Sequence, residues 1–241
     1  MSEPEGLRAL KKQRTRQAIA DTAIGLFLAN GFDQVSVAEI AAAAEVSKPT
    51  LFRYFATKEE LVLHRLSDHL GEAARVVRER PPGLPPLAAL ERHQLERLAA
   101  HDPVTGLNDH PEVLAFMRLV YDTPGLSSHL RDYIAEDTDA LTAALADARA
   151  DAERADADAR PDPGTDPDAR PDPDADPAAG TGPLVPRLIA TQFIGVRQEL
   201  VLANWRRLAA GTPMGEAHRL AVAEVAEAFA LLRDGAGPRG Y

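Results

Sequence analysis

Apolar residues recur at helical spacing along most of this chain. Near the start, Ile19, Ala23, Leu26 and Phe27 follow the i, i+4, i+7, i+8 pattern of an amphipathic helix. The same periodicity predicts five later helices, at about 85–100, 111–121, 124–147, 184–210 and 213–233. No segment shows the alternation of apolar and polar residues that is typical of a strand. The pattern therefore predicts an all-α protein with about nine helices.

Capping residues predict where the helices of the N-terminal part begin and end. We expect Thr15 to cap the first helix, and Gly31 to end it because glycine accepts the left-handed backbone conformation. Two capping boxes start further helices at residues 37 and 58, the second running to about 79; the boxes are Ser36 with Glu39 and Thr57 with Glu60. Between them, Ser47 caps a short helix over 48–54.

The stretch "EVSKPTLFRYF" at 45–55 holds the second helix of a helix-turn-helix. Pro49 fits its first turn, where a missing N–H breaks no helical hydrogen bond. We expect Val46, Leu51 and Phe55 to be buried against Phe27, Phe32 and Ile40. The opposite face then carries side chains that suit the major groove of DNA: Lys48, Thr50, Arg53 and Tyr54.

Within this unit the residue types suggest separate roles in DNA binding. Arg53 has the reach and the donors to read a guanine edge. The hydroxyls and the ammonium of a second group suit phosphates, together with the helix N-termini at 37 and 48: Ser36, Ser47, Tyr54 and Lys58.

Net charge argues at first against a nucleic-acid partner, because it is −10 over 241 residues. Its distribution reverses that conclusion. Residues 147–177 hold eleven acids and four arginines, and residues 7–16, "LRALKKQRTR", hold five basic residues and no acid. Local charge is therefore the better guide, and it places a basic arm beside the helix-turn-helix.

From about 148 to 183 the chain is rich in Asp, Ala and Pro and nearly free of apolar residues, with "DARPDP" at 158–163 and again at 168–173. Such a composition buries too little surface to offset the backbone entropy lost on ordering, about 1–2 kcal/mol per residue. We predict a flexible insertion here, either inert or binding a partner.

At 14–63 the chain resembles the TetR family of transcriptional regulators, on the ordered pattern "RTRQAIADTAIGLFLANGF" followed by "SVAEIAAAAEVSKPTLFRYFATKEEL". The resemblance implies an N-terminal arm and three-helix DNA-binding domain at 1–60. It also implies a larger helical domain at 61–241 for ligand binding and dimerisation. The family's DNA-contacting positions would be Ser36, Ser47, Lys48, Pro49, Thr50, Phe52, Arg53, Tyr54 and Lys58. Phe52 stands where members often have a tyrosine, so one phosphate contact is missing here.

In the larger domain the resemblance implies a pocket for a small effector and a homodimer formed through the last two helices. The stripes at 189–200 and 222–232 suit a four-helix bundle between subunits, although packing within one subunit predicts the same stripes. Asn204 and Trp205 are expected near that surface. Candidate effector-binding residues on the central helices are Phe116, Met117, Tyr121, Tyr133, Gln192, Phe193 and Arg197. A hydrophobic or amphipathic effector is expected.

Other function classes find little support. No zinc-protease, nucleophile-elbow, phosphate-loop or dinucleotide motif occurs, so we expect no enzyme, no catalytic residues, no metal site and no cofactor. The chain has no cysteine and no long apolar run, which favours a cytoplasmic protein without a membrane partner. The resulting hypothesis is a homodimeric repressor released from a pseudo-palindromic operator by its effector. The alternatives are an activator, an effector-independent regulator, or a helical interaction module that has lost DNA binding.

Overall fold

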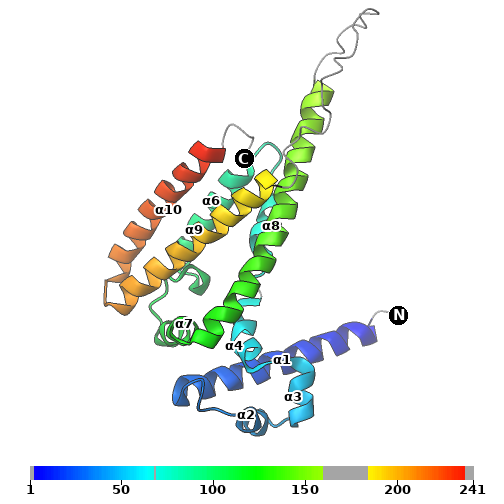
Figure 1. The fold of residues 1–241 in the computed structure, drawn as a ribbon, viewed down its shortest axis with the longest axis vertical. Coiled ribbons are helices and arrows are strands. Elements are labelled where there is room, and N and C mark those ends of the chain that lie inside the picture. The colour runs from blue at the N-terminus through cyan, green and yellow to red at the C-terminus, as the bar shows by residue number, and fades with distance from the viewer. Residues whose placement is uncertain (1–2, 68, 160–183, 237–241) are drawn as a thin grey trace, which may run out of the picture.

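The computed structural model describes residues 3–67, 69–159 and 184–236 (Figure 1). These residues form helices only, which confirms the all-α prediction. In chain order the elements are α1 (Glu3–Asn30), α2 (Val37–Ala43), α3 (Lys48–Tyr54), α4 (Lys58–Ser67), α5 (Glu72–Arg78), α6 (Pro86–Ala99), the 3-10 helix η1 (Pro103–Thr105), α7 (Pro111–Asp122), α8 (Pro124–Ala159), α9 (Leu184–Ala209) and α10 (Met214–Ala236). No described helix combines the length and apolar composition needed to cross a bilayer.

The first helix is longer than the sequence pattern indicated. It begins at Glu3, and the hydroxyl of Thr15 donates to the carbonyl of Lys11 at 2.9 Å, so Thr15 lies inside the helix and does not cap it. The segment 7–16 consists mainly of Leu, Ala, Lys, Gln and Arg, all good helix formers, so no local signal ends the helix there. The basic arm is therefore part of α1.

The single helix predicted from 58 to about 79 is two helices. Gly71 adopts a φ of 68°, in the left-handed region that glycine tolerates best, and it separates α4 from α5. At the start of α4, the N–H of Glu60 donates to the hydroxyl of Thr57 at 3.2 Å. The carboxylate of Glu60 accepts from Ala56 at 2.8 Å, one residue earlier than in an ideal capping box.

The long helix α8 continues twelve residues past the predicted end at 147, to Ala159. Ion pairs along its surface stabilise this alanine-rich part, with Arg149 bonded to Glu153 at 2.8 Å and Arg154 to Asp151 at 2.6 Å. The predicted start of the insertion at 148 is therefore wrong, and its part at 160–183 lies outside the described residues. In Figure 1 the end of α8 projects beyond the other helices.

Two hydrophobic clusters organise the packing. The first joins α1 to α4 around Phe27, Ile40, Leu51 and Phe55, as predicted, and it also includes Phe116 of α7. The second joins α5, α6, α8, α9 and α10. Because α4 and α7 belong to the first cluster, the helix-turn-helix unit is packed against the larger helical part rather than linked loosely to it.

The last two helices lie antiparallel to each other and are joined by a turn at Gly211, whose φ is 87° (Figure 1). Asn204 and Trp205 do not lie on an outer surface of this pair, which corrects the expectation for them. Asn204 is 1% exposed and donates to the carbonyl of Thr105 at 3.0 Å, and Trp205 stacks on Tyr121 within the subunit.

Candidate nucleic-acid interface and ligand cavity

The caps of α2 and α3 fix the helix-turn-helix. Ser36 accepts a hydrogen bond from the N–H of Glu39 at 3.2 Å, and its own N–H donates to the Glu39 carboxylate at 2.7 Å, which completes the predicted capping box. These bonds from Ser36, the backbone one first, lower the pKa of Glu39. The hydroxyl of Ser36 also donates to Glu39, so it must change partner before it can contact a phosphate.

The cap of α3 follows the sequence prediction. The hydroxyl of Ser47 accepts from the N–H of Thr50 at 3.2 Å and lies 2.8 Å from the Thr50 hydroxyl. Pro49 lies in the first turn of the helix, and Leu51 is buried on its inner side. This geometry holds a seven-residue helix with one face against α1 and α2 and the other free.

The free face of α3 brings together four of the predicted DNA-binding residues. Lys48, Pro49, Phe52 and Arg53 are exposed, and Phe52 keeps 52% of its surface accessible. Thr50 and Tyr54 are half-buried at the edges of this face, and the guanidinium of Arg53 lies 5.5 Å from the Tyr54 ring. A protruding helix with cationic and aromatic side chains matches what a major groove admits.

Lys58 is placed differently from the other predicted residues. Its ammonium group lies 4.3 Å from the ring centroid of Phe32 and 5.5 Å from that of Phe27. The side chain is half-buried over these two rings, which form cation–π contacts. To reach a phosphate it has to leave them.

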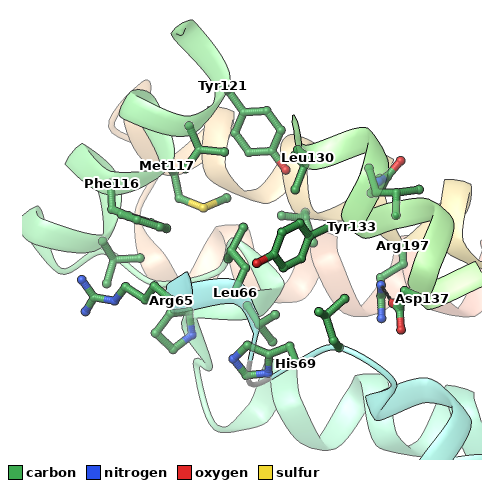
Figure 2. Close-up of a pocket in the computed structure, with 18 of the residues that line it drawn as sticks. Arg65, Leu66, His69, Phe116, Met117, Tyr121, Leu130, Tyr133, Asp137 and Arg197 are labelled. Carbon is green, nitrogen blue, oxygen red and sulfur yellow. Dashed lines mark hydrogen bonds and ion pairs between the residues drawn. The ribbon is translucent and has the colours of Figure 1, made fainter. Parts of the chain in front are cut away.

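A cavity of about 480 Å³ lies between α1, α4, α7, α8 and α9 (Figure 2). Its apolar wall comes mainly from α7, with Phe116, Met117 and Val120, and from Leu130 of α8. Figure 2 shows the rings of Tyr121 and Tyr133 entering the space from different helices. The volume suits a ligand of drug-like size.

Five of the seven residues predicted to contact an effector line this cavity: Phe116, Met117, Tyr121, Tyr133 and Arg197. Gln192 does not, because it lies on the exposed side of α9. Phe193 does not either, because it packs in the second hydrophobic cluster with its ring centroid 5.9 Å from that of Phe229. It touches only a smaller cavity of about 30 Å³ next to Arg197.

The structure adds polar residues that the sequence interpretation missed. Asp137 is 4% exposed, accepts a hydrogen bond from the N–H of Gly71 at 2.9 Å, and forms an ion pair with Arg197. Arg65 and His69, at the end of α4 and just after it, complete the polar side of the cavity. Asp137 lies four residues after Tyr133, on the same face of α8. That spacing in the sequence could have predicted that Asp137 also lies at the cavity.

The two tyrosine hydroxyls keep their protons at neutral pH. Burial raises the pKa of Tyr121 and of Tyr133, so both remain neutral groups able to donate a hydrogen bond. Behind Tyr121, the ring of Trp205 stacks with a centroid separation of 5.7 Å. The cavity thus combines an apolar wall with a few oriented donors.

Comparison with known proteins agrees with this geometry. The sequence profile described as "Bacterial regulatory proteins, tetR family" matches residues 19–64, which contain α2, α3 and the buried part of α1. The HTH-type transcriptional regulator TcmR of Streptomyces glaucescens is 42% identical over 125 residues, covering 50% of this chain and 54% of TcmR. The putative mycofactocin biosynthesis transcriptional regulator MftR of Mycobacterium tuberculosis is 44% identical over 62 residues, covering 26% of this chain and 31% of MftR.

The match to these curated relatives therefore spans about half of the first and a third of the second. Among solved structures, NalD of Pseudomonas aeruginosa, described as the secondary repressor of the MexAB-OprM multidrug efflux pump, shares the fold. Its TM-score is 0.51 at 18% identity, over 89% of this chain and 95% of that one. The profile match identifies residues 19–64 as a helix-turn-helix segment similar to that of the TetR family of bacterial regulatory proteins, and the overall fold is similar to that of NalD.

Proposed function

We propose that this protein is a homodimeric transcriptional regulator that represses transcription by binding a pseudo-palindromic DNA operator. The observation that carries the proposal is the free face of α3, where Lys48, Phe52 and Arg53 are exposed on a capped helix whose other face is buried. Both curated relatives are transcriptional regulators by name, which supports the same reading. Operator binding would take place in the cytoplasm.

On DNA, α3 enters a major groove, and its two kinds of side chain act differently. Arg53 donates to a base edge, which selects sequence. Ser47, Tyr54 and Lys58 contact phosphates, which fixes the helix in register without selecting sequence. Ser36 joins them when its hydroxyl turns away from Glu39, and Thr50 and Phe52 contact the groove wall.

A dimer places two copies of α3 on the operator, and the outer surface of α9 and α10 supplies the interface. Large apolar side chains are exposed there, among them Leu184 and Leu188 on α9 and Leu220 and Leu231 on α10. Exposed leucines on adjacent helices are costly in water and are covered when two copies pack as a four-helix bundle.

The effector is a small amphipathic molecule that binds in the cavity. Its apolar body lies against Phe116, Met117 and Leu130, and its acceptor atoms face Tyr121, Tyr133 and Arg197. The guanidinium of Arg197 has five N–H donors, so its ion pair with Asp137 leaves donors for a ligand at the cavity wall. Carbonyl or carboxylate oxygens on the effector satisfy the donors of Tyr121, Tyr133 and Arg197.

Selection of duplexes from a random pool, followed by titration at two salt concentrations, tests the proposal. We expect an enriched inverted repeat whose affinity falls steeply with salt, with a log–log slope of about −7 for roughly four phosphates per subunit. Enrichment without symmetry would contradict the dimer on DNA. Absence of binding even at low salt would contradict regulation through DNA and leave an interaction module.

A further inference from the structure

The first half of α1 is a basic helix that extends past the helix-turn-helix. In Figure 1 its N-terminal turns project beyond α3 and α4, while its C-terminal half lies over α2. Residues 8–16 carry five cations and no acid, and the two glutamates of this helix half, Glu3 and Glu5, precede them. Among the described residues, none of the exposed cations Arg8, Lys11, Lys12 and Arg14 has an ion pair within the subunit.

One face of α1 changes character along its length. Ile19, Ala23 and Phe27 are buried where α2, α3 and α4 cover the helix. Arg16, Lys12 and Arg8 continue the same stripe toward the N-terminus in steps of three or four residues. The stripe that is apolar under the covering helices is therefore basic where those helices end.

The direction of this basic stripe is fixed by Arg16. Its guanidinium lies 4.9 Å from the ring centroid of Phe55, the residue that ends α3. Lys12 and Arg8 lie about 6 Å and about 12 Å farther along the helix axis, at a rise of about 1.5 Å per residue. The side chains of Lys12 and Arg8 therefore point to the same side of α1 as α3. They lie farther along α1 than α3 reaches.

We propose that the first half of α1 is a second DNA-binding element, which binds phosphates of the duplex that flanks the site read by α3. The proposal rests on the proposed function, because it takes α3 as the element that enters the major groove. The basic stripe starts at Arg16, which packs against the C-terminal end of α3, and DNA carries one negative charge about every 1.7 Å of its axis. The acidic end of α8 lies at the opposite end of the molecule and does not oppose this contact (Figure 1).

The helix supplies its own matched control. Replacing Arg8 and Lys12 by alanine removes one arginine and one lysine from the stripe. Replacing Lys11 and Arg14 removes the same residue types from the same helix, but these two side chains point about 100° or more away from the stripe's centre. Both double variants change the net charge equally. A difference in DNA affinity between them therefore depends on the direction in which the side chains point and not on total charge.

The experiment compares two duplexes: the shortest duplex that the wild-type protein binds after selection, and the same duplex with eight added base pairs on each side. We expect the flanks to raise wild-type affinity at least tenfold at about 0.1 M salt. R8A/K12A should lose that gain, with a log–log salt slope shallower by about 3 to 4 for four lost phosphate contacts per dimer. K11A/R14A should stay within threefold of the wild type on both duplexes.

Three results overturn the proposal in distinguishable ways. If the flanks give the wild type no gain, α1 does not bind flanking DNA, although α3 can still read the short duplex. If both double variants lose affinity equally, the effect is one of overall charge and the stripe has no special role. If the wild type enriches no duplex at all, the proposed function fails together with this inference.

Discussion

At the scale of single residues, Arg53 is the side chain that we propose reads a base. Arg53 is exposed on α3, and its guanidinium lies 5.5 Å from the ring of Tyr54. This contact limits the conformations of the Arg53 side chain. We predict that Arg53→Ala weakens binding to the selected duplex by about 1–3 kcal/mol and relaxes preference at one base pair. Fluorescence anisotropy on duplexes with single base changes measures both effects. Equal losses on every sequence would show that Arg53 binds only the backbone, and Arg78→Ala on α5 controls for charge.

The carboxylate of Asp137 joins parts of the chain that are far apart in sequence, because it accepts from Gly71 and pairs with Arg197. We predict that Asp137→Asn lowers the free energy of unfolding by about 2 kcal/mol, since a hydrogen-bonded charge pair is lost in a buried position. Asp139→Asn on the same helix removes an exposed pair with Arg187 and should cost less than about 1 kcal/mol. Urea denaturation measures the difference, and equal losses would mean that Asp137 adds no special stability.

At the scale of helices, substitutions at the cap of α3 should distinguish an effect on stability from an effect on DNA binding. Ser47→Ala should lower the free energy of unfolding by about 1 kcal/mol, because the N–H of Thr50 loses its acceptor. Ser47→Asp keeps an acceptor there and should retain stability, but its negative charge should weaken binding to every duplex. Urea denaturation and DNA titration on the same samples test the pair. Normal DNA affinity for Ser47→Asp would place residue 47 away from the phosphates.

The helix boundaries show which features a sequence makes visible. The caps at Ser36 and Ser47 are local, so their residue types were sufficient to predict them. The break at Gly71 was missed because apolar spacing continues across it, and only the left-handed conformation marks the joint. The end of α8 was placed too early because its Asp- and Ala-rich composition resembles a disordered segment, while ion pairs at helical spacing support a helix.

The lining of the cavity could likewise be predicted from the sequence only in part. Periodicity indicates which residues of α7 and α8 share a face, and Phe116, Met117, Tyr121 and Tyr133 all line the cavity. It does not indicate how far along α9 the cavity reaches, because that depends on the helices packed around it. Phe193 is therefore core while Arg197, one turn later, is at the wall.

At the scale of the whole molecule, the exposed leucines of α9 and α10 predict the oligomeric state. We expect the wild-type protein to have about twice the chain mass of 25.9 kDa by light scattering. Leu188→Asp combined with Leu220→Asp should give a monomer, because two buried carboxylates per subunit oppose the interface. Leu7→Asp, at a leucine of α1 that is even more exposed, should leave the dimer intact. A monomeric wild type, or a dimer that survives the double change, would contradict the proposed interface.

The cavity shares its walls with the DNA-binding unit, since Gln17 of α1 and Arg65 and Leu66 of α4 border it. An effector can shift DNA affinity only as far as it binds the two states of the protein differently, typically by 1–3 kcal/mol. A side chain that fills the cavity should act like a permanently bound effector. We therefore predict that Met117→Trp raises the melting temperature and weakens operator binding at least fivefold.

Met117→Leu, which nearly conserves volume, should change neither property by much and serves as the control. Thermal denaturation and duplex titration, run on both variants, distinguish three cases. A more stable Met117→Trp protein with weaker DNA binding supports coupling from the cavity to α3 through α4. A more stable protein with unchanged DNA affinity means that filling this space does not move the reading helices, and the effector then acts elsewhere or not at all. A less stable protein would show that the cavity wall at α7 cannot accept the larger ring, and the substitution of Val120 on the same wall then repeats the test.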